Sequence, residues 1–253
     1  MRRDSLLLVL LGLCAAPCLQ AQSPVVAQTP PELEGALEIK WMRDSEEYAA
    51  LARMVYRSAE RVVGDAARRL PRGRAWAVVL DLDETALDNS IYQLSRKAYQ
   101  LPFDTASWNA WVRREDAGVV PGVVDFVTAM RRLGGHVAWI SSRGDMTRDP
   151  TVANMRARGL WNDDDRICLL TADPAYNKAA RRAEVASGSG RCAWDGTPMT
   201  VLGFFGDNIQ DFPQAGENDP DAGPSDAAFG TRFFMLPNPM YGGWVNAPTR
   251  KVR

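Results

Sequence analysis

The sequence predicts an α/β fold in which helices cover both faces of a parallel β-sheet. Five apolar runs have the length of strands, and they lack the polar-apolar alternation of a strand with one face in water. Segments with recognisable helix ends separate several of these runs. Buried strands that alternate with helices are typical of parallel sheets, so the two observations together predict this class. The predicted strands are 75–80, 136–140, 166–170, 200–205 and 231–236.

Three helices can be placed by their patterns and their ends. Apolar residues recur every three or four positions over 48–66, which predicts an amphipathic helix that begins near Asp44 and ends before Pro71. Two further helices are predicted over 121–134 and 149–159, each with a proline near its start and a glycine at its end. These helices separate apolar runs that are predicted to be strands.

Two stretches interrupt the alternation of strands and helices. Residues 90–120 contain two tryptophans and predict a helical insertion over the edge of the sheet, while 213–230 is rich in Pro, Gly and acidic residues and predicts a surface loop. The length of 253 residues suits one large domain with a small addition. We therefore expect an N-terminal helical segment over 38–74, a core over 75–246 and a tail over 247–253.

The first 21 residues have the layout of a secretory signal peptide. Two arginines precede the apolar run 6–13, which is too short to span a bilayer, and small residues follow it up to Ala21. We expect cleavage after Ala21, export to the periplasm or the medium, and no integral membrane span. Lipid attachment at Cys14 or Cys18 is the alternative, although the residues before both cysteines match a lipoprotein signal poorly. The polar, Pro-rich stretch 22–37 then predicts a mobile tether.

The counts of charged and rare residues limit the possible chemistry. Thirty basic and 31 acidic side chains nearly cancel, so nothing favours a nucleic-acid polymer as partner. The single histidine, His136, excludes a His-rich zinc site and a phosphohistidine mechanism with a second catalytic histidine. Cys168 and Cys192 remain after removal of the leader, either as a disulfide or as two buried thiols.

Carboxylates, a hydroxyl and an ammonium group are predicted to meet at one edge of the sheet. Ligands of open α/β sheets bind beyond the carboxyl ends of the strands, so the residues that follow each apolar run are the relevant ones. Asp81 and Asp83 follow the first strand, Ser141 the second and Asp207 the fourth, and Lys178 precedes the fourth. Two adjacent carboxylates without a histidine suggest a hard divalent cation. Phosphoryl transfer needs such a set, because the cation, the ammonium and the hydroxyl offset the charge of the phosphate.

Each of these residues also has a purely structural explanation. Asp-x-Asp before a helix often caps that helix, a Gly-Asp-Asn turn is usually only a turn, and Ser141 and Lys178 could merely cap or face solvent. Their joint placement, each at or near the end of its own strand, favours chemistry over these separate explanations.

Four segments resemble the motifs of the haloacid dehalogenase (HAD) superfamily, in the form found in bacterial class C acid phosphatases, including the lipoprotein 5′-nucleotidases. The likeness extends over about residues 39–246. It implies a HAD-like, Rossmannoid sheet with a small helical cap formed by the N-terminal helix and the insertion after the first strand. The four segments are 81–89 (DLDETALDN), 140–143 (ISSR), Lys178 and 206–212 (GDNIQDF).

The resemblance also implies roles for individual residues. Asp81 would be the nucleophile and Asp83 the general acid and base, while Ser141 and Lys178 would bind the phosphoryl group. A nucleobase would stack on Tyr241 and on a tryptophan of the insertion, either Trp108 or Trp111. The implied Mg²⁺ ligands are the Asp81 side chain, the Asp83 main-chain carbonyl and Asp207, with Asp211 supporting the site.

These observations predict an exported, Mg²⁺-dependent acid phosphatase. Its substrates would be small phosphomonoesters, nucleoside 5′-monophosphates first, and it would act through an aspartyl phosphate. One alternative is a phosphotransferase that passes the same intermediate to an alcohol. Another is a non-catalytic surface or storage protein on the HAD fold, although the intact nucleophile speaks against it. A periplasmic ligand-binding protein would need two similar lobes, which the sequence lacks, and the oligomeric state stays open.

Overall fold

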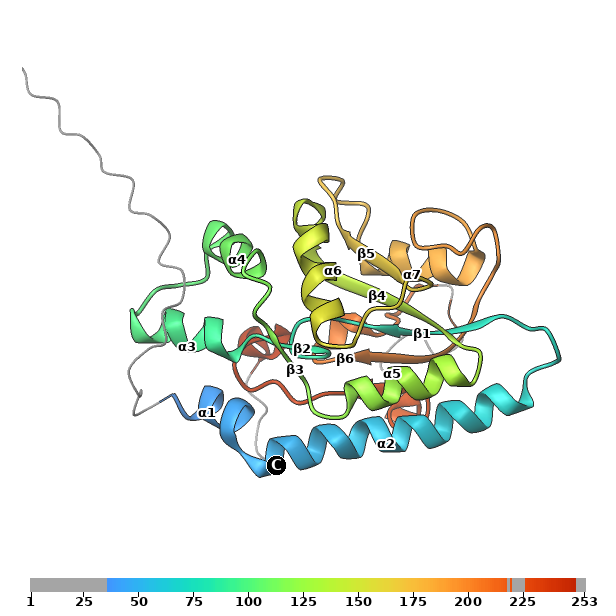
Figure 1. Cartoon of the computed structure of the whole chain (residues 1–253), viewed down its shortest axis with the longest axis horizontal. Helices are drawn as coiled ribbons and strands as arrows, with labels where there is room; N and C mark the ends of the chain where they lie inside the picture. Colours follow the sequence, from blue (N-terminus) through green and yellow to red (C-terminus); the bar gives the residue numbers. More distant parts are fainter. Residues whose placement is uncertain (1–35, 218, 220–225, 249–253) are drawn as a thin grey trace, which may run out of the picture.

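A five-stranded parallel sheet forms the centre of the protein (Figure 1). The computed structural model describes residues 36–217, 219 and 226–248. The strand order is β5-β4-β1-β6-β7, and every neighbouring pair is parallel. All five strands predicted from the sequence are present, which confirms the α/β class. Their bounds are β1 Trp76–Leu80, β4 His136–Gly144, β5 Arg166–Leu170, β6 Thr200–Gly206 and β7 Phe233–Met235.

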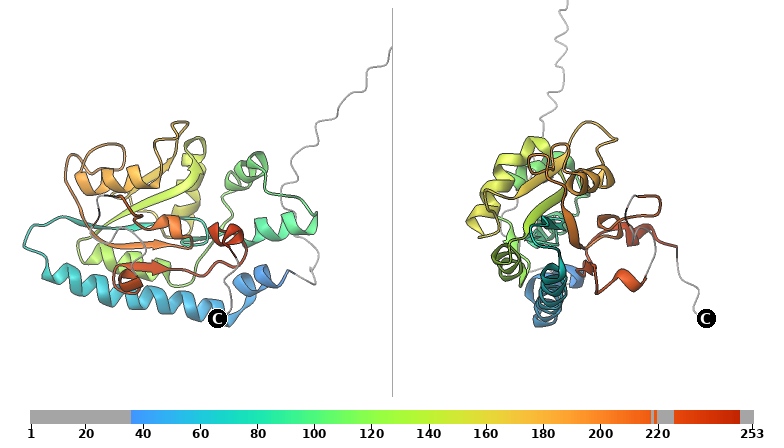
Figure 2. Two further views of the ribbon diagram at one scale, coloured as in Figure 1. Left: turned by 180° about the vertical axis from the view of Figure 1, so that it is seen from behind. Right: turned by 90° about the vertical axis from the view of Figure 1, so that its right-hand side faces the viewer.

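Helices cover both faces of this sheet, as Figure 2 shows from two further directions. Alternate residues of β1 face opposite sides, so Val78 and Leu80 belong to one apolar core and Ala77 and Val79 to the other. The first core includes side chains of α2, α5 and α6, and the second includes Val185 of α7. The bounds of these helices are α2 Glu46–Arg69, α5 Val123–Arg132, α6 Arg148–Ala157 and α7 Lys178–Ser187.

The long helix α2 follows from its sequence. The Ser45 hydroxyl accepts a hydrogen bond from the Tyr48 N–H at 3.1 Å, and acidic residues occupy the first turn, where the helix dipole favours them. Its apolar stripe faces the sheet, where the ring of Tyr56 stacks on Phe205 of β6 with centroids 5.9 Å apart. The helix therefore forms part of the main core.

The insertion after β1 forms the helical cap. It contains α3 (Ser90–Ala98) and α4 (Thr105–Val112), and a two-stranded antiparallel sheet of β2 (Leu87–Asp88) and β3 (Gly118–Val119) joins it to the core. Strands of two residues are too short to leave a sequence pattern, so the sequence did not predict them. A further short helix, α1 (Leu37–Asp44), packs against α3, so the N-terminal segment reaches the cap through α1 while α2 lies on the sheet.

The predicted signal peptide, most of the tether, part of the 213–230 loop and most of the tail lie outside the described residues, and α1 begins at the last tether position.

Cys168 and Cys192 form a disulfide, which decides between the two alternatives for these cysteines. Within the described ranges, no helix has both the length and the apolar character that a membrane crossing requires. The short 3₁₀ helices are η1 Asp145–Thr147, η2 Ile209–Asp211, η3 Asp226–Ala228 and η4 Gly243–Asn246.

Candidate active site

A cavity of about 850 Å³ opens at the carboxyl ends of the central strands, between the sheet and the cap. After β1 the chain adds β4 and β5 on one side of it and then β6 and β7 on the other. A crevice forms beyond the end of β1, where the strand order reverses. Asp81 and Asp207 line the cavity from the ends of β1 and β6. Lys178, the first residue of α7, reaches it from the second face of the sheet. The convergence expected from strand ends is therefore present.

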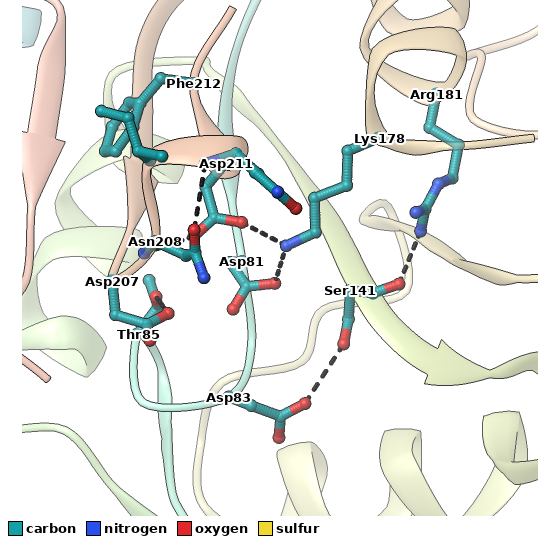
Figure 3. A network of polar contacts seen from close by, with 12 residues as sticks. Asp81, Asp83, Thr85, Ser141, Lys178, Arg181, Asp207, Asn208, Asp211 and Phe212 are labelled. Atoms are coloured by element: carbon teal, nitrogen blue, oxygen red, sulfur yellow. Dashed lines mark hydrogen bonds and ion pairs between the residues drawn. The ribbon is translucent and has the colours of Figure 1, made fainter. Parts of the chain in front are cut away.

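Lys178 lies between two carboxylates at the base of this cavity (Figure 3). Its Nζ donates to Asp81 Oδ1 at 2.5 Å and also to Asp211 Oδ1. Asp81, Asp207 and Asp211 each offer a carboxylate oxygen, and these three oxygens lie within 4.8 Å of one another. One ammonium group thus faces three acids.

This imbalance of charge shows in the pKa values of the acids. Burial raises the pKa of Asp207 to about 7, the charge of Asp211 adds to this rise, and a hydrogen bond from Asn238 opposes it. Burial also raises the pKa of Asp81 well above its usual value, and the positive charge of Lys178 opposes this rise only in part. Burial lowers the pKa of Lys178, but its two acidic partners outweigh burial and leave this pKa above its ordinary value.

The donor set fits a hard divalent cation. It consists of carboxylate oxygens, which Mg²⁺ prefers, and it carries more negative charge than Lys178 offsets. A bound cation would favour the ionised carboxylates that burial and mutual repulsion disfavour. Asp81 and Asp207, two of the Mg²⁺ ligands that the resemblance implied, belong to this group, and its third member is Asp211, for which the resemblance implied a supporting role.

The β6 end of the site depends on a close approach of backbone and side chain. Asp211 Oδ2 accepts the Asn208 N–H at 2.9 Å, which turns its carboxylate back over the strand end. A Cβ on Gly206 would lie 2.6 Å from the Asp211 Cγ, so this position requires glycine. Asp207 is held from the other side, because its Oδ2 accepts from Asn238 Nδ2 at 2.8 Å. The Gly-Asp-Asn sequence is therefore more than a turn.

The β1 end of the site is a tight loop. Glu84 has a left-handed backbone with φ of 59°, and its N–H bonds the Leu87 carbonyl at 2.8 Å. The hydroxyl of Tyr56 on α2 donates to the Thr85 carbonyl at 2.6 Å, and Thr85 Oγ1 donates to Asp207 Oδ1 at 3.2 Å. The loop that follows Asp81 is thus tied both to α2 and to the end of β6.

Asp83 lines the cavity, but its carboxylate faces a different set of partners from that of Asp81. Arg143 Nη2 donates to Asp83 Oδ1 at 2.7 Å. Figure 3 shows the contact of Ser141, whose Oγ lies 3.4 Å from Asp83 Oδ2. Ser141 itself is fully buried, and its main-chain carbonyl accepts from Arg181 at 2.6 Å. Its neighbour Ser142 lines the cavity.

The structure separates the three aromatic residues that the sequence proposed for stacking. Trp108 and Tyr241 both line the cavity, although they are far apart in the sequence. Trp108 comes from α4, and Tyr241 from the C-terminal segment. Trp111 is 2% exposed, does not line the cavity, and donates its indole N–H to Asn89 Oδ1 at 2.8 Å. Of the two tryptophans, Trp108 is therefore the one placed to meet a ligand.

Several polar partners of the site were not assigned roles from the sequence. Arg143 and Asn89 bind Asp83, while Thr85 and Asn238 bind Asp207. Thr85, Asn89 and Arg143 lie inside the four segments that carry the family resemblance, so their positions could be singled out, whereas Asn238 lies outside those four segments. Their roles could not, because each contact joins residues that are brought together only by folding, apart from the six-residue separation of Asn89 and Asp83.

Comparison with known proteins places this arrangement in a family. Residues 13–244 match the model of HAD superfamily subfamily IIIB, described as acid phosphatase. The chain belongs to this family. The match covers most of the sequence, including all five strands and every residue of the site described above, and it confirms the resemblance inferred from the four motifs.

Two kinds of relative agree with the subfamily IIIB assignment. The class C acid phosphatase of Bacillus anthracis with tungstate bound superposes with a TM-score of 0.66 at 29% identity, over 82% of this chain and 85% of that one. A second structure of the same enzyme gives 0.66 and 28% over the same shares. Acid phosphatase 1 of tomato (Solanum lycopersicum) is 24% identical over 169 residues, or 64% of this chain. The match spans 57% of the tomato protein's length.

Proposed function

We propose that this protein is an exported, Mg²⁺-dependent acid phosphatase that hydrolyses small phosphomonoesters through an aspartyl phosphate on Asp81. The observation that carries the proposal is the placement of the Asp81 carboxylate against Lys178, with Asp207 and Asp211 beside it, at the base of a cavity of about 850 Å³. Membership of an acid phosphatase subfamily supports the same reaction class.

The chain's own residues suit the two halves of this reaction. A carboxylate oxygen of Asp81 attacks phosphorus while the ester P–O bond breaks, and Asp83 gives a proton to the departing oxygen. Water then attacks the aspartyl phosphate, Asp83 takes a proton from that water, and phosphate leaves Asp81. Lys178 stays charged throughout, since its pKa is raised, and its ammonium group offsets charge on the phosphoryl oxygens.

Asp81, Asp207 and the Asp83 main-chain carbonyl would hold the Mg²⁺, with Asp211 and Lys178 fixing the carboxylates around it. When bound, the cation supplies charge that lets the anionic Asp81 approach an anionic phosphate. The tungstate bound to the Bacillus anthracis relative supports an oxyanion as the ligand, because tungstate has the tetrahedral shape of phosphate.

Nucleoside 5′-monophosphates are the substrates that the rest of the cavity favours. Trp108 and Tyr241 offer aromatic faces, and Phe103, which is exposed, pairs with the Trp108 ring at 6.4 Å between centroids. A planar base can stack on such rings, and stacking contributes about 1 to 3 kcal/mol per base. The predicted signal peptide and the Cys168–Cys192 disulfide support an oxidising location outside the cytoplasm.

A substrate panel tests this function. The purified protein is assayed on nucleoside 5′-monophosphates, sugar phosphates and aryl phosphates, with Mg²⁺ and with a chelator, at acid and neutral pH. We expect hydrolysis of all three classes with Mg²⁺, with the highest kcat/KM on nucleotides. Release of no phosphate from any of them would contradict the function, and transfer to an added alcohol in preference to water would favour the phosphotransferase.

A pair of variants tests the stacking surface within that panel. Trp108→Ala should raise KM for nucleotides by about tenfold, which corresponds to roughly 1.4 kcal/mol of lost stacking, while KM for a small alkyl phosphate changes little. Tyr99→Ala is the matched control, because Tyr99 is an exposed aromatic of the cap that does not line the cavity. Equal KM changes for both substrates in Trp108→Ala would exclude stacking.

A further inference from the structure

Arg143 is a buried cation that the proposed reaction does not use. Its side chain is 1% exposed, and it follows Ser142 near the end of β4. A buried guanidinium is costly unless its donors are satisfied. Here Nε and Nη2 donate to Asp83 Oδ1 at 3.0 and 2.7 Å, and Nη1 donates to Thr151 at 3.2 Å. The guanidinium therefore holds the Asp83 carboxylate through two N–H groups that converge on Oδ1.

Asn89 fixes the same oxygen from a second direction. Its Nδ2 donates to Asp83 Oδ1 at 3.0 Å, and its own Oδ1 accepts from the Trp111 indole at 2.8 Å and from Arg143 Nη2 at 3.3 Å. These acceptor contacts set the orientation of the amide. Trp111, which does not reach the cavity, thus contributes to the site through Asn89.

The two oxygens of Asp83 are consequently unequal. Oδ1 accepts three N–H groups, two from Arg143 and one from Asn89. The contacts that the structure describes for Oδ2 are longer, 3.3 Å from Arg143 Nε and 3.4 Å from Ser141 Oγ. A carboxyl oxygen that already accepts three donors is poorly suited to carry a proton, whereas Oδ2 retains that capacity.

We propose that Arg143 is the positioning residue for Asp83, holding Oδ1 so that Oδ2 is the oxygen that exchanges protons with the leaving group and with water. The inference rests on the proposed function of Asp83 and adds to it. In the first half-reaction the proton on Oδ2 passes to the ester oxygen as the P–O bond breaks. In the second half-reaction Oδ2 regains a proton from the water that attacks phosphorus.

Arg143 also joins Asp83 to the cap. Its guanidinium lies 5.6 Å from the centroid of the Trp108 ring, a cation-π arrangement between the end of β4 and α4. Replacement of Arg143 can therefore alter substrate affinity through Trp108 as well as proton transfer through Asp83. The test must separate these effects, and rates at saturating substrate do so.

Dependence on the leaving group is the readout that a merely structural role would not change. An alkyl phosphate needs a proton on its departing oxygen, whereas 2,4-dinitrophenyl phosphate releases a stable anion that does not. The first turnover at saturating substrate and Mg²⁺ is measured for both compounds by rapid quench. Arg143→Gln removes the positive charge and the paired N–H groups of the guanidinium. Arg143→Lys keeps the charge but not the paired N–H groups.

The matched control is Arg131→Gln. Arg131 also donates two N–H groups to one buried aspartate, Asp165, at 3.2 and 2.6 Å, but it does not line the cavity. Its loss tests the general cost of breaking a buried arginine-aspartate pair. Thermal unfolding of each variant, with Mg²⁺, shows the folded fraction in every assay.

We expect the first turnover of Arg143→Gln to fall about 100-fold on the alkyl phosphate and less than about fivefold on the dinitrophenyl ester, a range within that of acid catalysis. Arg143→Lys should lie between Arg143→Gln and the unchanged protein, and Arg131→Gln should show no such contrast. Equal losses on both esters, or no loss, would overturn the proposal. If Arg143→Gln does not fold, the contrast in Arg143→Lys decides in the same way.

Failure of this inference differs from failure of the proposed function. If the unchanged protein hydrolyses neither ester, or if Asp81→Asn retains its rate, the phosphatase mechanism itself is wrong. If the unchanged protein is active, Asp81→Asn is inactive and the arginine variants show no leaving-group contrast, only the role of Arg143 is refuted.

Discussion

Two buried clusters, one around a single aspartate and one around three, differ in how their negative charge is balanced. At the amino end of β5, the single carboxylate of Asp165 accepts two N–H groups from Arg131, the indole of Trp139 at 2.9 Å and the main-chain N–H of Asn162 at 3.2 Å. At the carboxyl end of β1, three carboxylates face the one ammonium group of Lys178. The first cluster is complete in itself, and the second needs further positive charge.

The pKa values show the same contrast. Burial raises the pKa of Asp165, and the hydrogen bonds from Arg131 and Trp139 oppose this rise. Burial raises the pKa of Asp207 to about 7, and here a second acid, Asp211, adds to the rise. A buried acid whose hydrogen bonds and charge are satisfied therefore indicates a structural role. Buried acids that repel one another indicate a site that a cation completes.

The largest expected effect is the loss of the proposed nucleophile. Asp81→Asn keeps the shape of the side chain but cannot form the aspartyl phosphate, so the initial rate should fall by about 10⁴-fold or more. Thermal unfolding should show a folded protein, because removal of one of the mutually repelling charges relieves the cluster. A phosphatase rate close to that of the unchanged protein would refute the mechanism.

Removal of the divalent cation is expected to have the next largest effect. Dialysis against a chelator should reduce the rate by roughly 10³-fold, since the cation contributes several kcal/mol of charge stabilisation. Added Mg²⁺ should restore the rate, and it should raise the unfolding temperature with the logarithm of its concentration once that concentration exceeds Kd. An unchanged rate in chelator would show that the acids around Lys178 do not hold a required metal.

The Asp165 cluster should respond in the opposite way. Arg131→Gln leaves a buried carboxylate without its cation, which should lower the free energy of unfolding by about 3 to 5 kcal/mol. Denaturant unfolding measures this loss, and the rate per folded molecule should stay close to that of the unchanged protein. A large fall in that rate at constant folded fraction would show that the two clusters are not independent.

The smallest expected effect is a change in how stability depends on pH. In metal-free protein the pKa of Asp207 is about 7 when folded, against an ordinary value of 3.8, so the folded state binds this proton more tightly. The proton on Asp207 therefore stabilises the folded state fully below about pH 4, and this stabilisation is lost as the pH rises to about 7. The unfolding temperature of Asp207→Asn should therefore fall less steeply between pH 4 and 7 than that of the unchanged protein.

The exposed acid Glu60 on α2 provides the control for that experiment. Glu60→Gln should retain the slope of the unchanged protein between pH 4 and 7. Identical slopes in Asp207→Asn and Glu60→Gln would mean that folding does not raise the pKa of Asp207.

The sequence was sufficient to predict the strands and the acids at their ends. Apolar runs and helix ends are local signals, so β1, β4, β5, β6 and β7 could be placed within a few residues. Because parallel strands end at one edge, the positions of Asp81, Asp83 and Asp207 in the sequence already implied that they meet. The two-residue strands β2 and β3 and the short helix α1 left no such signal.

Only the tertiary structure decided how the side chains at that edge divide the work. Lys178 lies 97 residues from Asp81, and Arg143 lies 60 residues from Asp83, so neither contact has a local signature. Trp108 and Trp111 are one helical turn apart, yet only Trp108 faces the cavity. The orientation of a side chain depends on the packing and hydrogen bonds of distant segments, and these exist only in the folded chain.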